Sequence, residues 1–257
     1  MAPVDERRVR VFGTRAVLEA LADPRVPVER LLVARTARGE AVEQVLAAAA
    51  GRGLRADRVA AEKVHRASGS PHHDQGVLAE VVAGGIEPLE AWLARHPAPG
   101  PVALLLLDGV TNPANVGMVV RSAAGAGLDG TILPRTGSPD VGPLLVRASA
   151  GVALRAPILR CATAGAAVEA LTAAGVDAVG LRAGHAPSLF DAELPVRAAH
   201  VLGNEAEGLS PAVARRVRAW RSIPLAGGVE SLNVAVTAAV VAFEASRRRG
   251  GPTRPAT

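Results

Sequence analysis

The stretch that decides the fold is Leu107-Asp-Gly-Val-Thr-Asn-Pro-Ala-Asn115-Val-Gly-Met-Val-Val-Arg121. It continues an apolar run, so Leu104–Asp108 is predicted to be a buried strand that ends in a polar loop. A helix rich in small residues is expected to begin near Val116 and to cover Gly117–Ala126. In open parallel sheets, ligands bind beyond the carboxyl ends of the strands. The polar residues of this loop therefore indicate a binding site.

The same order of strand, loop and helix repeats on both sides of this stretch. Such alternation predicts a parallel sheet covered by helices on both faces. The further buried strands are expected at Thr131–Leu133, Pro157–Leu159, Val176–Leu181 and His200–Leu202, with helices at Thr163–Ala174 and Asn233–Ser246.

The first part of the chain, residues 9–82, predicts a smaller α/β unit. Its helices are expected near residues 14–21, where Thr14 can cap, and at Glu40–Ala50; its strands are expected at Arg30–Ala34 and Gly76–Val82. The predicted division is an N-terminal domain at 1–84, a linker at 85–101 with a helix-like Leu89–Leu93, a second domain at 102–246, and a disordered tail at 247–257.

Composition limits the class of protein. The chain has 257 residues, 49% hydrophobic and 21% charged, which is enough apolar material for a folded core. A net charge of +5 favours a polyanionic partner, whereas 2% aromatic residues argue against base stacking as the main mode of binding. The single cysteine, Cys161, excludes a disulfide framework and a Cys-rich zinc site. With neither a signal peptide nor a long apolar run, we expect a soluble, cytoplasmic protein with no membrane segment.

Two later segments carry polar residues and glycines where a plain core would not. Leu202-Gly203-Asn-Glu205-Ala-Glu-Gly208 follows a predicted strand, and Ile223-Pro-Leu-Ala-Gly-Gly-Val-Glu-Ser231-Leu-Asn233 precedes the last helix. A tight turn with a solvated Glu205 would explain the first segment, and simple capping by Ser231 or Asn233 the second. Both segments also suit a ligand, because glycine allows close backbone approach and free helix N–H groups bind anions or carbonyls.

Arg121 also admits two interpretations. Its neighbours on the predicted helix are apolar, and an arginine is costly to bury there without a partner. Its stem could cover the core while its guanidinium reaches water. Alternatively, the guanidinium is directed at a phosphate or carboxylate, which the nearby polar loop favours.

Other motifs carry less weight. Gly125-Ala-Gly127-Leu-Asp-Gly130 matches the dinucleotide pattern, but a helix precedes it and a strand follows, the reverse of what a nucleotide-dependent oxidoreductase requires. His72-His73-Asp74 has no spaced partner cluster, so no metal site is predicted.

The three polar segments, in this order, resemble the signature motifs of the SpoU/TrmH family, the RNA 2′-O-ribose methyltransferases of the SPOUT class. Phe12-Gly-Thr-Arg-Ala-Val and His73-Asp-Gln-Gly-Val-Leu-Ala resemble the small N-terminal substrate-binding domain of its two-domain branch. The resemblance implies an L30e-like α/β domain, followed by a parallel sheet with a C-terminal trefoil knot.

The resemblance also implies a cofactor and site residues. S-adenosylmethionine would be held at Gly203, Ile223 and Leu232. The polar active-site positions would be Asn115, Arg121, Glu205, Ser231 and Asn233. Asn112 stands where close relatives often carry Asp, and we do not assign it a catalytic role.

In the family proposal Arg121 is the general base, assisted by the RNA phosphate. An arginine is an awkward base because its pKa exceeds about 12. In a second hypothesis Arg121 holds the phosphate and stabilises the developing alkoxide, while Glu205 or a nearby water takes the proton.

The expected partners are RNA, most specifically 23S ribosomal RNA, and a second copy of the chain in a homodimer through the knot region. The small residues of the last helix would permit close helix packing, and a contact within the chain explains them equally. A tRNA enzyme, an antibiotic-resistance ribosomal RNA methyltransferase and a non-catalytic RNA-binding or ribosome-assembly factor remain alternatives. The basic stretch Arg52–Arg66, expected to be a loop, could contact RNA or be solvated.

Overall fold

The computed structural model describes residues 6–184, 186–204 and 206–251. The chain forms two compact units. The first comprises the described residues up to Ile86 together with Val141–Ala156, and the second comprises Glu87–Asp140 and the described residues from Pro157 onward. Segment 141–156 therefore belongs to the first unit, although it lies within the range predicted for the second domain.

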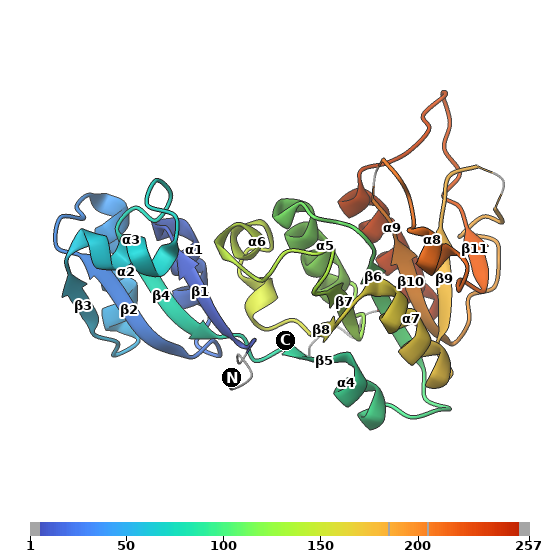
Figure 1. Ribbon diagram of the computed structural model, residues 1–257, viewed down its shortest axis with the longest axis horizontal. Helices are drawn as coiled ribbons and strands as arrows, with labels where there is room; N and C mark the ends of the chain where they lie inside the picture. The colour runs from blue at the N-terminus through green and yellow to red at the C-terminus, as the bar shows by residue number, and fades with distance from the viewer. Residues whose placement is uncertain (1–5, 185, 205, 252–257) are drawn as a thin grey trace. The chain divides into compact units, whose positions relative to one another are not determined.

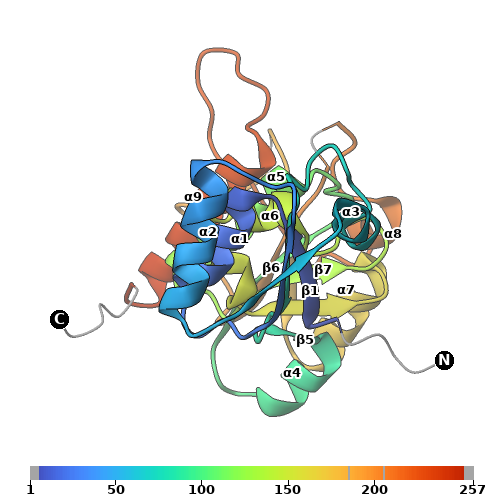
Figure 2. The same cartoon turned by 90° about the vertical axis from the view of Figure 1, so that its left-hand side faces the viewer.

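The first unit is built on a four-stranded sheet in the order β1-β4-β2-β3. Strand β4 is antiparallel to β1 and β2, and β3 is parallel to β2. Helices α1 and α2 cover one face and α3 the other, where Val64 packs on Leu32 and Leu78 (Figures 1 and 2). The elements of this unit are β1 (Arg8–Phe12), α1 (Thr14–Ala22), β2 (Val28–Ala34), α2 (Glu40–Gly51), β3 (Ala56–Val59), α3 (Ala61–Ser68), β4 (Val77–Val82), α6 (Pro143–Ala148) and a 3-10 helix at Val152–Leu154.

The second unit is built on a seven-stranded sheet in the order β11-β9-β10-β6-β7-β8-β5. The adjacent strands from β11 to β8 are all parallel, which confirms the predicted parallel α/β fold. Its elements are β5 (Ile86–Pro88), α4 (Leu89–Arg95), β6 (Val102–Leu107), α5 (Pro113–Gly125), β7 (Gly130–Pro134), β8 (Ile158–Cys161), α7 (Ala164–Ala173), β9 (Asp177–Leu181), β10 (Arg197–Leu202), α8 (Pro211–Ala214), β11 (Ala219–Arg221) and α9 (Val234–Arg248).

Helices cover both faces of this sheet. On one face α4 and α7 pack on Leu104, Leu106, Ala199 and Val201. On the other face α5 packs against α9, and α9 lies on β6 and β10 (Figure 1). The small side chains Ala235, Ala238 and Ala242 of α9 are buried. The packing of α9 within the chain therefore accounts for the small residues of the last helix.

Several predictions about secondary structure need correction. Thr14 does not cap α1 from outside; it is the first helical residue, and both its N–H and its hydroxyl lie 2.9 Å from the side-chain oxygen of Gln75. The segment 52–66 is not a loop, because it contains β3 and most of α3. Arg52 directs its guanidinium at backbone carbonyls, among them that of Val26 at 2.8 Å.

The predicted linker and tail are also more regular than expected. The linker contains β5 and α4, with Leu89 and Trp92 buried, so it is part of the second unit. Helix α9 runs to Arg248, two residues into the range predicted to be disordered. Glu244 holds this end, because its carboxylate accepts hydrogen bonds from Arg247 and Arg248 at 2.8 and 2.6 Å. The part of the tail from 252 to 257 lies outside the described residues.

The His72-His73-Asp74 stretch has a structural role through its aspartate. Asp74 is fully buried and accepts hydrogen bonds from His65, Ser68 and the backbone N–H of Gly76, each at 2.8 Å. Burial alone would raise the pKa of Asp74, but the hydrogen bonds outweigh burial and the pKa is lowered. Among the described residues, no group of three or more His, Cys, Asp and Glu side chains is placed to hold a metal ion. No helix in the described ranges is long and apolar enough to cross a membrane.

Candidate active site

The polar segments identified in the sequence lie at the carboxyl-terminal edge of the seven-stranded sheet. The loop after β6 and the loop after β10 leave neighbouring parallel strands, because Leu107 is paired with Leu202. Parallel strands end at the same edge, which is where ligands bind in such sheets.

Helix α5 begins three residues earlier than expected. Asn112 is its N-cap, with its side-chain oxygen 2.9 Å from the N–H of Ala114, and Pro113 is the first helical residue. Proline is well suited to that position because its missing N–H would be unpaired there anyway. Asn112 therefore has a capping role, and Asn115 lies in the first turn of the helix.

Two of the predicted polar residues meet where α5 and α9 begin. Asn115 is buried, and its side-chain oxygen accepts a hydrogen bond of 3.3 Å from the amide of Asn233. Asn233 is also the N-cap of α9, because its side-chain oxygen accepts from the N–H of Ala235 at 2.9 Å. The side chain of Asn233 therefore caps α9 and contacts Asn115 at the same time.

A cavity of about 370 Å³ opens between the loops that follow β9, β10 and β11. All three residues predicted to hold the cofactor line it, as does Ser231: Gly203 and Leu202 from the end of β10, and Ile223, Ser231 and Leu232 from the segment before α9. Its other walls include Leu181, Arg182, Leu209, Trp220 and Glu230.

Gly203 is required by the turn itself. A Cβ atom on Gly203 would lie 2.2 Å from the backbone of Gly208, with which the following residue Asn204 forms a two-way backbone pairing. The pairing of Asn204 with Gly208 therefore closes a turn after β10, and the Gly203 backbone at this turn lies on the cavity wall. Glu205 of the same segment lies outside the described residues.

Asp108 and Asn204, to which the sequence patterns assign no role, connect the loops. Asp108, buried at the end of β6, accepts a 2.7 Å hydrogen bond from the N–H of Ser210. Asn204 donates to the carbonyl of Gly109 at 3.0 Å and accepts from the N–H of Ala206 at 2.8 Å. Their position directly after apolar strands was the available signal for both residues.

Arg121 lies on the exposed side of α5. It does not line the cavity, and its guanidinium has no ion-pair partner among the described residues. The guanidinium is thus accessible to an external anion. By contrast, Arg160 and Arg197 on strands β8 and β10 are buried.

His200 lies on β10, two residues before Leu202, which lines the cavity. It is buried on β10, and its neighbours Ala199 and Val201 face α4 and α7, so alternation places His200 on the α5 and α9 face. Its Nδ1 is buried, with no hydrogen-bond partner among the described residues. Burial, and to a smaller extent the charge of Arg221, lower the pKa of His200 to about 4, so the imidazole is neutral at neutral pH.

This arrangement can hold a small molecule of mixed polarity. The cavity has the volume of a small-molecule site, apolar walls and a few convergent polar groups. Ser231 lines the cavity, Asn233 lies between its lining residues Leu232 and Val234, and Arg121 is exposed. Together with the parallel sheet, these features are those of a small-molecule binding site at the carboxyl ends of the strands.

Comparison with known proteins gives the family. Residues 103–243 match the family model described as the SpoU rRNA methylase family, and residues 10–84 match the model described as RNA 2′-O ribose methyltransferase substrate binding. The chain therefore belongs to the SpoU rRNA methylase family and is an RNA methyltransferase.

Individual relatives span most of the chain. It is 35% identical over 241 residues to an uncharacterised tRNA/rRNA methyltransferase of Mycolicibacterium smegmatis, covering 93% of this chain and 76% of that one. It is 31% identical over 240 residues to the 23S rRNA (guanosine-2′-O-)-methyltransferase RlmB of Xylella fastidiosa, covering 93% and 96%. The SpoU methyltransferase AviRb of Streptomyces viridochromogenes, solved with the cofactor AdoMet, superposes with a TM-score of 0.70 and 28% identity, covering 95% and 91%.

Proposed function

We propose that this protein methylates the 2′-oxygen of a ribose in 23S ribosomal RNA, with S-adenosylmethionine as methyl donor, in the cytoplasm. The observation that carries the proposal is the cavity at the carboxyl edge of the sheet, beside the Asn115–Asn233 pair. Relatives named as ribosomal RNA 2′-O-methyltransferases match the chain over nearly its whole length.

The cavity fits the proposed cofactor. Ile223 and Leu232 offer apolar walls for an adenine, and the backbone of Gly203 offers groups for hydrogen bonding. When bound, S-adenosylmethionine supplies a methyl group activated by its sulfonium. The chain itself must then orient the ribose and stabilise charge on the 2′-oxygen.

Arg121 is proposed to hold the phosphate next to the target ribose. A guanidinium binds phosphate through two parallel hydrogen bonds, and its positive charge favours the developing alkoxide. Asn115 and Asn233 are proposed to position the ribose, Ser231 to line the donor site, and Glu205 or a water beside it to take the proton. The family's own proposal makes Arg121 the general base. Both proposals predict that Arg121→Ala loses methyl transfer.

Because Arg121 is absent from the walls of its own cavity, we infer that it acts across a homodimer. Helices α5 and α9 expose the large apolar side chains Met118, Val236 and Phe243, each at least 40% accessible. A second copy packed on these helices would bury them. Mixing Arg121→Ala protein with a Gly203→Ala cavity variant tests the inference: mixed dimers should regain activity if Arg121 acts across the interface.

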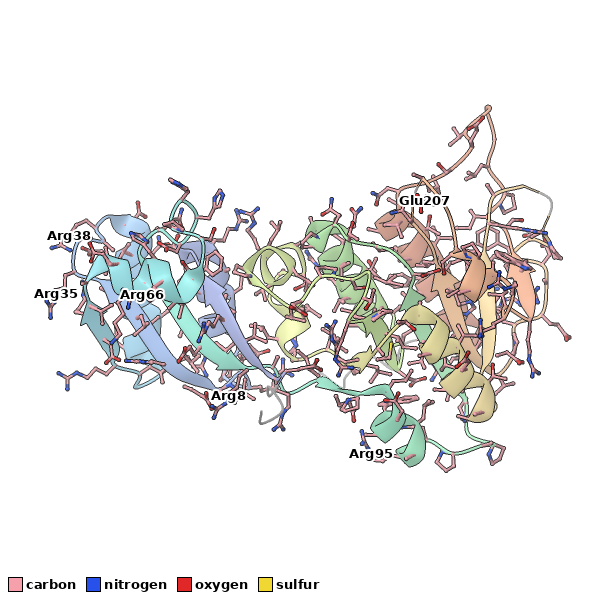
Figure 3. All side chains as sticks on the ribbon, in the orientation of Figure 1. Arg8, Arg35, Arg38, Arg66, Arg95 and Glu207 are labelled. Atoms are coloured by element: carbon pink, nitrogen blue, oxygen red, sulfur yellow. The ribbon has the colours of Figure 1, made fainter. Side chains whose placement is uncertain are left out.

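The first unit is proposed to be the L30e-like RNA-binding domain, and the second the knotted methyltransferase domain. Arg35 and Arg38 follow β2, and Arg66 lies on α3; all three are exposed (Figure 3). Replacing Arg35 and Arg38 by alanine should weaken RNA binding and its salt dependence. Arg8 is the control: it is exposed at the start of β1, which runs in the same direction as β2 on the other side of β4, so Arg8 lies at the opposite end of the strands, where it pairs with Glu29 at 3.3 Å.

The decisive experiment is methyl transfer from labelled S-adenosylmethionine to total RNA from a strain that lacks the gene. Label at a ribose 2′-oxygen of large-subunit RNA would support the full proposal. Label in tRNA would keep the chemistry and replace the substrate. Absence of both label and cofactor binding would overturn the proposal in favour of a non-catalytic RNA-binding factor.

A further inference from the structure

One wall of the cavity carries an arginine held by an aromatic ring. The guanidinium carbon of Arg182 lies 5.0 Å from the ring centroid of Trp220, a cation–π contact. The ring is fixed in turn, because Trp220 on β11 is paired with Gly180 on β9 and a Cβ on Gly180 would lie 2.9 Å from the ring. The guanidinium of Arg182 therefore lies over the Trp220 ring beside the cavity that both residues line.

Arg182 has no acidic partner for its charge among the described residues. Glu230, which lines the same cavity from the segment before α9, likewise has no ion pair within the described ranges. An adjoining cavity is lined by Glu230 and shares Ala183, Ile223 and Leu225 with the first. The site therefore presents one positive and one negative side chain, on different loops, to whatever occupies it.

The proposed cofactor carries a matching pair of charges. Its methionine portion has one carboxylate, the only anionic group of the molecule, and one ammonium. A planar guanidinium forms two parallel hydrogen bonds with a carboxylate, and a glutamate is suited to an ammonium.

We propose that Arg182, held on Trp220, binds the carboxylate of the methionine portion of S-adenosylmethionine, and that Glu230 binds its ammonium. This inference rests on the proposed function, because it assumes that the cavity is the cofactor site. It assigns two charged side chains to a ligand that the sequence motifs connect only with Gly203, Ile223 and Leu232.

Calorimetry on the full chain tests the inference without any activity measurement. The ligands are S-adenosylhomocysteine, which has both charged groups, and 5′-methylthioadenosine, which lacks both. Arg182→Met should weaken binding of S-adenosylhomocysteine by roughly tenfold to a hundredfold, the usual effect of losing a charged hydrogen bond. Binding of 5′-methylthioadenosine should change less than about twofold.

Further variants separate charge from geometry. Arg182→Lys should recover part of the lost affinity, because lysine keeps the charge but not the planar fork. Trp220→Leu should weaken S-adenosylhomocysteine binding more than 5′-methylthioadenosine binding.

Glu230→Gln should also weaken S-adenosylhomocysteine binding more than 5′-methylthioadenosine binding. Decarboxylated S-adenosylmethionine keeps the ammonium but lacks the carboxylate, so its affinity should not change in Arg182→Met. Arg216→Met is the matched control, since Arg216 is exposed, does not line the cavity and pairs with Glu169 at 2.6 Å.

Three results would overturn the inference. Equal weakening of both ligands by Arg182→Met would mean that Arg182 only supports the cavity wall. Unchanged S-adenosylhomocysteine binding with a raised KM for RNA would make Arg182 a contact for an RNA phosphate. If neither ligand binds the wild-type protein, the proposed cofactor site itself fails, which is a distinct outcome because no variant is needed to observe it.

Discussion

The two edges of the seven-stranded sheet use arginine in opposite ways. At the amino-terminal edge, Arg197 begins β10 and is buried, and its guanidinium donates to five backbone carbonyls, those of Gly175, Pro97, Gly100, His96 and Ala174. At the carboxyl-terminal edge, Arg182 directly follows β9, is exposed and has no ion pair among the described residues. Arg121, about two turns into α5, is likewise exposed and without an ion pair in the described ranges.

In an arginine-rich chain, the partners of each guanidinium separate arginines that hold the fold from arginines that can bind a ligand. A guanidinium whose donors are all directed at backbone carbonyls holds loops in place and has nothing left for a ligand. A guanidinium without a protein partner, placed where parallel strands end, is available for phosphate or carboxylate. Sequence composition cannot distinguish the two kinds, because both are simply arginine.

The largest effect should follow from Arg121→Ala. We expect the rate of methyl transfer to fall by about a thousandfold or more, because charge stabilisation at the reacting oxygen is lost. Calorimetric affinity for S-adenosylhomocysteine and the thermal midpoint should stay near wild type. Arg121→Lys is the sharper comparison: near wild-type turnover there would contradict a phosphate contact that depends on the planar fork.

Arg197→Met should lower the stability of the fold, which Arg121→Ala leaves near wild type. Removal of the guanidinium leaves several carbonyls without their donor, and we expect a loss of roughly 3 kcal/mol in the free energy of unfolding. Denaturant titration measures it, with Arg216→Met as the exposed control expected to change stability by less than about 1 kcal/mol. A stable Arg197→Met protein would remove the contrast between the two edges.

His200 is buried within the sheet, between its two edges, and predicts how stability depends on pH. Its pKa is lowered from 6.5 to about 4 in the folded chain, so the unfolded chain binds a proton first as the pH falls. Stability should therefore decrease from pH 6.5 towards pH 4, by about 2 kcal/mol at pH 5. The unfolding free energy of His200→Leu, measured at the same pH values, should lack this part of the slope, and parallel curves for the two proteins would contradict the assignment.

The smallest effect is expected from Asn204→Ala. This change removes the hydrogen bond to Gly109 that connects the loops after β10 and β6, and should cost about 1 kcal/mol of stability. Because the same loop lines the cavity, affinity for S-adenosylhomocysteine should fall modestly as well. Asn112→Ala, which removes only the cap of α5, should reduce stability by a similar amount without changing that affinity.

The amino-acid pattern alone predicted the parallel α/β arrangement of the second unit and the polar loops at one edge of its sheet. Apolar strands such as β6 and β10 are followed by polar, glycine-containing loops, and the carboxyl ends of parallel strands must meet at one edge. Resemblance to family motifs then singled out Gly203, Ile223 and Leu232, which line one cavity. Local pattern sufficed here because burial and turn formation are properties of neighbouring residues.

Which charged side chains have protein partners, and which loops are connected, depends on the three-dimensional arrangement of the strands. The carbonyls that Arg197 binds come from residues as far away in the chain as His96. The contact of Asp108 with Ser210 joins the loop after β6 to the loop after β10. The cation–π contact of Arg182 with Trp220 likewise depends on β11 pairing with β9. Such partners are set by strand order in space, which the pattern of a single segment does not contain.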